Sequence, residues 1–199
     1  DRSVSRGLGD VYKRQNMLNT RYFIFPLQGG KTMPIQNPYT LGNAWFVDKV
    51  QYVNNANEEI ESLHKVMPAK VAVVDKKFAE QVKPVAVSDS LSFVKLVAYE
   101  PNDLKYEVSS EKGGVVVFSE IYYPGWQAYI DGVEAPHGRA DYILRAMNVP
   151  AGKHTVEFKF DPKSLHTTET IAFVALGLLA MAVLLLLVLQ GKALWGKKG

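Results

Sequence analysis

The chain has 199 residues, of which 47% are hydrophobic, and a formal net charge of +3. This length and apolar content predict a globular protein of one or two domains with a core of its own. The absence of cysteine from the sequence excludes disulfide bonds and cysteine-based zinc sites.

Residues 1–15 do not look like native protein sequence. Residues 5–15 read like the in-frame translation of a transposon adapter used to make sequencing libraries, so we expect residues 1–15 to be a non-native scar, irregular and unattached to the core. They hold four basic and two acidic side chains, which leaves a net charge of only +1 for the remainder. We therefore expect no nucleic-acid partner, and we expect native sequence to be missing upstream of Asn16.

Residues 16–87 predict a small α/β segment. The apolar run at 21–26 ends at a proline and indicates a strand, and the glycine pair after it indicates a turn. An irregular passage is expected over 34–42, where two prolines occur. An alternating run at 43–53 predicts a second strand, whose register the pattern leaves open.

The clearest soluble helix is predicted over 56–66. Asn55 or Asn57 can cap it, and Glu58 and Glu59 lie in its first turn, where the helix dipole favours anions. Its apolar residues recur at three-residue spacing and predict one buried stripe: Ile60, Leu63 and Val66. We expect the acidic residues to be solvated rather than catalytic.

A strand at 70–75 completes the α/β segment, and Asp75 at its end is likewise expected to be solvated. From residue 88 to 162 the sequence pattern changes to short runs of alternating apolar and polar residues, with turn signals about every 8 to 12 residues. This pattern is typical of a β-sandwich. The strands are predicted at 91–99, 104–108, 115–118, 140–147 and 154–160, and the segment 118–132 is predicted as strand, corner, strand and hairpin turn. Residues 115–118 are apolar on both faces, which predicts a central strand covered on both sides.

The centre of this sandwich is the segment FSEIYYPGWQAYIDG at 118–132, in which a Pro-Gly corner and an Asp-Gly hairpin turn separate two strands. Four features in this order resemble the C-terminal end of the YfhO family of bacterial multi-spanning membrane proteins. They are this segment, the R-x-D-Y-x-L-R-A pattern at 139–146, VPAGKHTVEFKFDP at 149–162 and the apolar helix that follows. Upstream, MLNTRYFI and NPYTLGNAWFV are similar to the segment that precedes that domain in the family. The resemblance covers Asn16 to the C-terminus.

The resemblance implies a membrane-embedded, glycosyltransferase-like protein with a large extracytoplasmic region, whose Gram-positive members are linked to the glycosylation of cell-wall polymers. Glycosyltransferases of this architecture usually carry an acidic catalytic residue in an early extracytoplasmic loop. That region lies outside this chain, so no catalytic residue is carried over, and whether the whole protein is an enzyme stays open.

Residues 171–189 contain no charged or polar side chain. At about 1.5 Å per residue this run crosses roughly 30 Å, the hydrocarbon thickness of a bilayer. A helix that is apolar on every side needs an apolar solvent, so we predict a transmembrane helix over 167–190. Three threonines can cap its start: Thr167, Thr168 and Thr170.

The charges beyond this helix favour one orientation. Lys192, Lys197 and Lys198 follow it, whereas its other flank mixes acidic and basic residues. Because lysine and arginine gather on the cytoplasmic side, we expect a cytoplasmic tail at 191–199 and an extracytoplasmic soluble part, in the bacterial cell membrane. The fold class is thus predicted as mainly β: an antiparallel sandwich preceded by a small α/β segment and followed by one transmembrane helix.

No nucleophile elbow, phosphate loop or metal-ligand spacing occurs in the sequence, and the four histidines are scattered. We predict no catalytic residue, metal site or cofactor in this chain. The strongest binding candidates are aromatic rings that can dock sugar faces, together with polar side chains that can hold hydroxyls or anions. They are Tyr122, Tyr123, Trp126, Tyr129, Asp131, Arg139 and Asp141.

A structural interpretation competes with each of these. Trp126 after a Pro-Gly corner is typical of a core plug, and Asp131 before Gly132 is typical of a hairpin turn. Two functions therefore stand side by side. The first is the C-terminal domain and last span of a YfhO-like protein that supports glycosyl transfer onto an envelope polymer or lipid, with the bilayer, a lipid-linked sugar or an envelope glycan as partners. The second is a non-catalytic sandwich, tethered by one helix, that binds glycan or another envelope protein.

Overall fold

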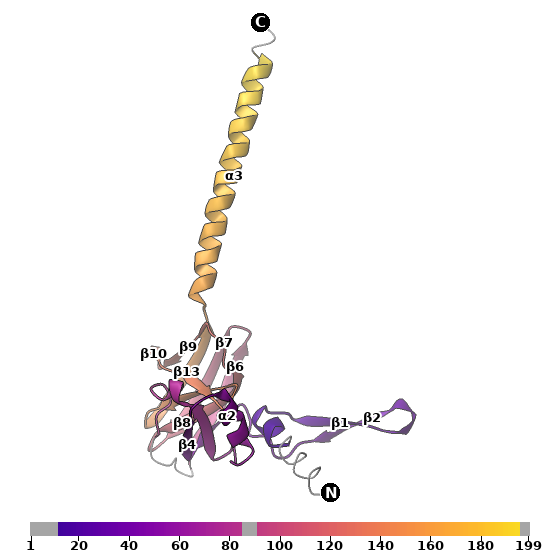
Figure 1. Cartoon of the computed structure of the whole chain (residues 1–199), viewed down its shortest axis with the longest axis vertical. Helices are drawn as coiled ribbons and strands as arrows, with labels where there is room; N and C mark the ends of the chain where they lie inside the picture. Colours follow the sequence, from indigo (N-terminus) through magenta and orange to yellow (C-terminus); the bar gives the residue numbers. More distant parts are fainter. Residues whose placement is uncertain (1–11, 85–90, 196–199) are drawn as a thin grey trace. The chain divides into compact units, whose positions relative to one another are not determined.

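The computed structural model describes residues 12–84 and 91–195, which fall into two compact units that meet in sequence between Phe160 and Asp161 (Figure 1). The first unit is mostly antiparallel β-structure with a small α/β unit, and the second contains one long apolar helix. The predicted fold class is therefore confirmed.

Two antiparallel sheets form the sandwich. The five-stranded sheet has the order β10-β9-β13-β7-β6, with β6 at Phe93–Glu100, β7 at Asp103–Ser110, β9 at Trp126–Ile130, β10 at Val133–Ala135 and β13 at Gly152–Phe160. The four-stranded sheet has the order β11-β12-β8-β3, with β3 at Ala44–Val47, β8 at Gly114–Ile121, β11 at Gly138–Ala140 and β12 at Leu144–Val149. The strand β3, which precedes the predicted sandwich boundary at residue 88, thus completes one of its sheets.

The core between the sheets is built on three aromatic rings. The ring of Phe118 on β8 lies 4.9 Å from that of Tyr106 and 4.8 Å from that of Phe158, both on the opposite sheet. Both contacts have the edge-to-face geometry that favours aromatic pairs. The predicted alternation of β7 and β13 is confirmed, because Leu104, Tyr106 and Val108 and also Val156 and Phe158 are buried.

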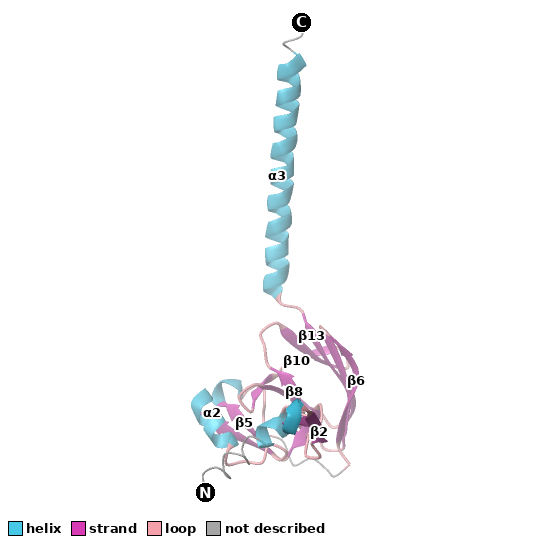
Figure 2. Ribbon diagram, turned by 90° about the vertical axis from the view of Figure 1, so that its right-hand side faces the viewer, coloured by secondary structure: helices cyan, strands magenta, loops and turns pink. Residues whose placement is uncertain are grey.

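The strand β8 is buried on both faces, as its unbroken apolar run predicts. Val116 and Phe118 face the core between the sheets, whereas Val115 and Val117 face a second core shared with the α/β unit. In Figure 2, α2 and β5 lie on one side of β8, and β6 and β13 lie on the other. This strand therefore joins two layers of apolar packing.

The α/β unit consists of β4 at Lys49–Val53, α2 at Ala56–Leu63 and β5 at Val71–Asp75, with β4 and β5 parallel. Asn55 caps α2 by accepting a hydrogen bond from the backbone N–H of Glu58 at 3.0 Å. A short 3₁₀ turn, η2 at Lys76–Phe78, follows β5.

The strand predicted at 43–53 is two strands in different sheets. β3 pairs with β8 and β4 pairs with β5. At the break, the N–H groups of Asp48 and Lys49 both donate to the carbonyl of Lys70, at 2.8 and 3.1 Å. This local irregularity redirects the chain from one sheet to the other.

The strand predicted at 140–147 is also interrupted. Asp141 and Tyr142 have φ angles of 50° and 75°, so β11 ends before them and β12 begins after them. The cause lies on β5, because the N–H of Asp141 donates to the carbonyl of Val73 at 2.7 Å and its side chain accepts from the N–H of Val73 at 2.8 Å. These two bonds hold the chain in a left-handed conformation that aspartate tolerates better than most residues.

Two expectations near the start of the chain are wrong. Residues 12–17 are helical, although 12–15 were expected to be irregular, and Arg14 contacts the ring of His64 at 2.8 Å. The passage expected to be irregular from residue 34 begins inside a hairpin made of β1 at Tyr22–Pro26, η1 at Gln28–Gly30 and β2 at Thr32–Gln36. A two-stranded sheet has only edge strands, which is where a proline such as Pro34 is accepted. The first eleven residues, including the apolar ones of the predicted scar, lie outside the described residues.

The second unit contains α3 at Lys163–Trp195, of which Ser164–Leu189 is long and apolar enough to cross a membrane. The helix begins earlier than predicted. As a result Thr168 and Thr170 do not cap it, and their hydroxyls donate to the carbonyls of Ser164 and His166 one turn earlier, each at 2.8 Å.

Replacing Phe118 by alanine is expected to destabilise the first unit by about 3–5 kcal/mol, because it empties the centre of the three-ring core. The measurement is urea unfolding of the whole chain in detergent, followed by tryptophan fluorescence. Phe93→Ala is the matched control, since that ring is 49% exposed and its loss is expected to cost less than about 1 kcal/mol. Equal losses in the two variants would contradict the central position of Phe118.

Candidate functional site

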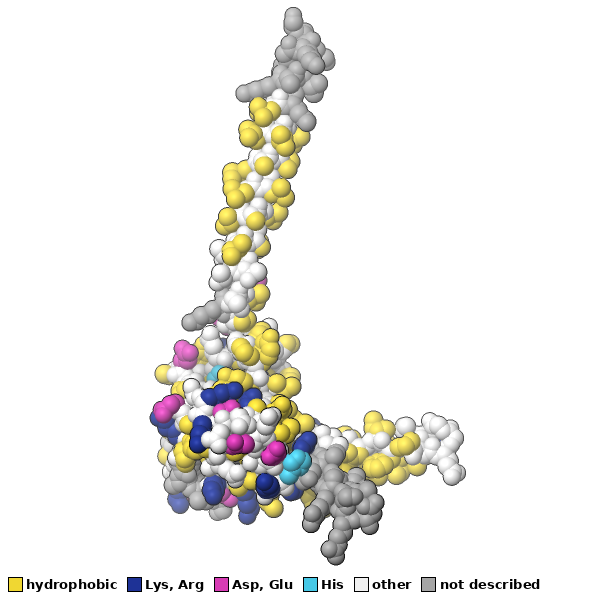
Figure 3. Space-filling view, in the orientation of Figure 1, with side chains coloured by type: hydrophobic (Ala, Val, Ile, Leu, Met, Phe, Trp, Pro, Cys, Tyr) yellow, Lys and Arg dark blue, Asp and Glu magenta, His cyan; other side chains and the backbone are white. Residues whose placement is uncertain are grey.

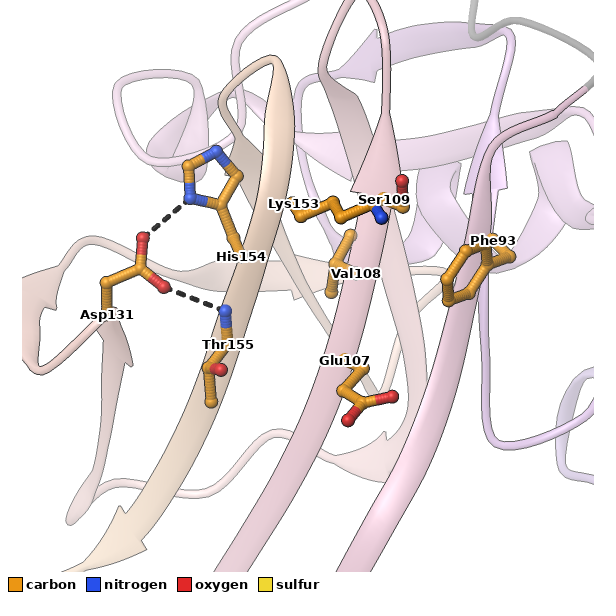
Figure 4. A pocket seen from close by; sticks show the side chains of 8 residues that line it. All are labelled: Phe93, Glu107, Val108, Ser109, Asp131, Lys153, His154 and Thr155. Carbon is orange, nitrogen blue, oxygen red and sulfur yellow. Dashed lines mark hydrogen bonds and ion pairs between the residues drawn. The ribbon is translucent and has the colours of Figure 1, made fainter.

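A depression on the described surface lies where the hairpin turn between β9 and β10 meets β13 (Figure 4). Its volume is about 390 Å³. The lining residues are Phe93, Glu107, Val108, Ser109, Asp131, Lys153, His154 and Thr155. Among the sequence candidates, only Asp131 belongs to this depression.

Asp131 and His154 form a dyad that resembles a catalytic pair. The Nδ1 of His154 lies 2.6 Å from Oδ2 of Asp131, while Oδ1 of the same carboxylate accepts from the N–H of Thr155 at 2.8 Å. The bond to His154 and then that from Thr155 lower the pKa of Asp131. The bond to Asp131 and then that to the carbonyl of Ala151 raise the pKa of His154.

The second ring nitrogen decides what this dyad can do. The Nε2 of His154 lies 3.1 Å from the carbonyl oxygen of Ala151, which can only accept a hydrogen bond. Both ring nitrogens therefore face acceptors, an arrangement that favours the doubly protonated imidazolium. Neither nitrogen is free to take a proton from a substrate, so the dyad ties the hairpin turn to β13.

A second group of polar residues is buried between the α/β unit and the sandwich. Glu59 on α2 is 0% exposed, and its Oε2 lies 2.6 Å from the guanidinium of Arg139, whose Nη2 also lies 3.9 Å from Asp75. The other oxygen, Oε1, accepts from the backbone N–H of Tyr142 at 2.9 Å. The expectation that Glu59 and Asp75 are solvated is wrong, because their partner reaches them from β11.

Burial raises the pKa of Glu59, and the hydrogen bond from Tyr142 and the charge of Arg139 oppose this effect. Arg139 is also packed on aromatic faces, with its guanidinium carbon 5.6 Å from the ring centres of both Phe78 and Tyr142. Glu59, Asp75 and the two rings thus engage Arg139, while its buried Nε has no hydrogen-bond partner among the described residues. Glu59, Arg139 and Asp75 therefore form a polar joint that connects the α/β unit to the sandwich.

Asp141 lies beside this joint and is fully buried. Its Oδ1 accepts from Val73, whereas its Oδ2 has no hydrogen-bond partner among the described residues. Burial raises the pKa of Asp141 to about 7, with a further contribution from the charge of Glu59. Its partners belong to the backbone of β5, so this candidate serves to attach β5 to the sandwich.

Arg145 on β12, which was not among the sequence candidates, is the largest fully buried side chain of the described residues. Its guanidinium carbon lies 4.0 Å from the ring centre of Trp126 and 4.9 Å from that of Phe158, and its Nε donates to the carbonyl of Ile121 at 3.0 Å. Burial lowers the pKa of Arg145, and the nearby Glu120 opposes this effect. The alternating pattern of β12 could have identified Arg145, because it places this cation at a position that faces the core.

The four aromatic candidates do not share a surface. Trp126 is half-buried over Arg145 and lies 5.3 Å from the ring of Phe160. Tyr122 packs against Phe78 at 5.2 Å. By contrast, Tyr123 is 60% exposed, and Tyr129 stands on the outer face of the five-stranded sheet.

The surroundings of Tyr129 are polar. Its hydroxyl donates to Oε1 of Gln127 at 2.6 Å, and the amine of Lys159 lies 5.6 Å from its ring centre. Glu157, its cross-strand neighbour, is paired with Lys105 at 2.8 Å and with Lys159 at 3.2 Å, and these bonds lower the pKa of Glu157. This part of the sheet offers an aromatic face with hydrogen-bonding groups around it.

Among the residues that the structure describes, no group of three or more histidine or acidic side chains is placed to hold a metal ion. Residues 79–172 match the model of a family described as bacterial membrane protein YfhO. Neither the comparison with curated proteins nor the comparison with solved structures found a match. The family match confirms the predicted resemblance over these residues, and with α3 it supports a membrane protein of that family.

The raised pKa of Asp141 predicts a pH dependence of stability. In the unfolded chain this carboxyl ionises near pH 3.8 and in the folded chain near pH 7, so its contribution is fully present below pH 3.8 and is lost as the pH rises to about 7. The loss is roughly 1.4 kcal/mol per pH unit within this window. Asp141→Asn is expected to remove this slope while keeping the bond from Val73.

The free energy of unfolding of the whole chain in detergent, measured in urea at pH 5 and pH 7, tests this prediction. Glu59 titrates in both proteins, so the difference between wild type and variant reports Asp141 together with its coupling to Glu59. Identical slopes in the two proteins would contradict a neutral, buried Asp141.

Proposed function

Because residues 79–172 match the YfhO family of bacterial membrane proteins, we propose that this chain is the extracytoplasmic β-sandwich and adjoining span of such a protein. In this proposal it supports glycosyl transfer onto a cell-envelope polymer or lipid. The observation that carries it is the extent of the match, which runs through the sandwich strands and into α3. The match thus supports treating the sandwich strands after residue 79 and the start of the apolar helix as parts of one unit.

The role we propose for the sandwich is to hold the acceptor rather than to catalyse the transfer. Its buried or bonded acids have structural partners: Glu59 is paired with Arg139, Asp141 with Val73, and Asp131 with His154. A general acid or base must be able to exchange a proton with the substrate. A catalytic carboxylate would therefore come from another part of the protein.

The surface around Tyr129 is the best candidate for contacting a saccharide. Sugar rings dock their C–H faces on aromatic rings, and amide and charged groups beside the ring can bind their hydroxyls. Gln127, Glu157 and Lys159 provide such groups around Tyr129. Tyr123 offers a second exposed ring. By contrast, the side chains of four other candidates pack against or bond to groups of the protein itself: Trp126, Tyr122, Arg139 and Asp141.

The same surface also favours the alternative function, a non-catalytic, membrane-tethered sandwich that binds glycan or an envelope protein. Glu157, the acid next to Tyr129, is held in its charged form by two lysines and would bind rather than exchange a proton. The two candidates share the binding step and differ in whether sugar transfer is lost when the surface is removed.

The proposed topology places the C-terminus in the cytoplasm. A fluorescent protein fused after Gly199 is expected to glow and alkaline phosphatase at the same site to be inactive, because three lysines follow the span. The control replaces Lys192, Lys197 and Lys198 by glutamine and is expected to shift part of the population to the reverse orientation. An active phosphatase with a dark fluorescent fusion would reverse the topology.

Tyr129→Ala is expected to weaken glycan binding by roughly fivefold, since a stacking aromatic ring contributes on the order of 1 kcal/mol. The probe is solubilised cell-wall polymer from a Gram-positive bacterium, with or without its sugar substituents, added to the whole chain in nanodiscs. Tyr99→Ala is the matched control, because Tyr99 is 64% exposed near the other edge of the same sheet. Equal binding by both variants would remove Tyr129 from the proposed surface.

A further inference from the structure

The hairpin of β1 and β2 projects from the first unit as a separate two-stranded sheet (Figure 1). In the part of the chain that the structure describes, no other strand pairs with it. In Figure 3, hydrophobic side chains gather along its length. Isolated two-stranded sheets are marginally stable in water, so this hairpin needs a surface to cover it.

Both faces of the hairpin are apolar. Its register puts Phe23 beside Ile35 and Phe25 beside Met33 on one face. The other face carries Tyr22, Ile24 and Pro34. Ile24 is 71% exposed. The first face borders a mostly apolar groove of about 370 Å³, which is also lined by Tyr12 of the predicted scar, whose ring lies 5.6 Å from that of Phe23. An exposed apolar patch of this kind marks an interaction site.

The charge of this region is one-sided. No aspartate or glutamate occurs from residue 12 to residue 47, whereas Arg21 precedes β1 and Lys31 lies in the turn at its tip. Lys13 and Arg14 add to the positive charge but belong to the predicted scar, so they do not enter the argument. Exposed apolar and aromatic side chains combined with cations and no anions are complementary to an anionic bilayer surface.

We propose that the hairpin of β1 and β2 docks on the surface of a bilayer that contains anionic phospholipid. Tyr22 and Ile24, which share one face, would enter the boundary between headgroups and acyl chains, and Arg21 and Lys31 would pair with lipid phosphates. The free backbone groups at its two edges confine it to the hydrated headgroup level, because open sheet edges do not occur in hydrocarbon. The apolar α3 favours this occupant over a protein, since a membrane anchor raises the effective concentration of the bilayer at the hairpin. The inference does not depend on glycosyl transfer.

The absence of cysteine makes a site-specific probe possible. Ile24→Cys, labelled with an environment-sensitive fluorophore, is reconstituted as the whole chain in nanodiscs of phosphatidylcholine with or without phosphatidylglycerol. Val133→Cys is the matched control, because Val133 is also aliphatic and 71% exposed but lies on β10. The emission of the probe and its quenching by brominated lipids report insertion.

With anionic lipid, the probe at position 24 is expected to shift to the blue and to be quenched by brominated lipid, while the probe at position 133 stays water-like. Arg21→Gln combined with Lys31→Gln is expected to weaken insertion by on the order of 30-fold, at about one factor of five per cation. A water-like probe at position 24 in anionic discs would overturn the proposal. So would a shift that needs two chains per disc and ignores the lipid charge, because it would assign the hairpin to a second copy.

Discussion

Burial of both faces of β8 is the constraint on which the rest of the first unit depends. A strand with four consecutive apolar residues cannot present a face to water without cost, so it needs one layer on each side. The five-stranded sheet provides the first layer and the α/β unit provides the second. The α/β unit is therefore part of the same packing as the sandwich and not an independent module beside it.

Polar groups then fix the positions of these layers. Apolar contacts alone are tolerant of sliding, whereas a buried carboxylate must meet its donor at hydrogen-bond distance. Glu59 meets Arg139 and the N–H of Tyr142, and Asp141 meets the N–H of Val73. Glu59, Arg139 and Asp141 are of the types found in catalytic sites, but here they hold the layers of the fold together. The groups that can still bind a partner lie on the outer face of the five-stranded sheet and on the hairpin of β1 and β2.

The fold could be predicted from the sequence wherever neighbouring residues determine the outcome. The alternation of β7 and β13, the Asn55 cap and the hairpin turn at Asp131 each depend on positions close in the chain. The break at Asp141 and the burial of Glu59 depend on partners 68 and 83 residues away, so no local pattern announces them. The candidate site was dispersed for the same reason, because the side chains that contact Trp126 and Arg139 come from elements distant in the chain, such as β12 and α2.

The order of strands also has a consequence for folding during synthesis. The middle strand of the five-stranded sheet is β13, with β9 on one side and β7 on the other, although it is the last strand in the chain. Until it emerges, the β6–β7 and β9–β10 hairpins have exposed edges and no shared ladder. Only two residues separate its end from α3. The sheet is thus completed just before α3 is made, and a nascent chain that ends before residue 152 lacks the strand that joins the two hairpins.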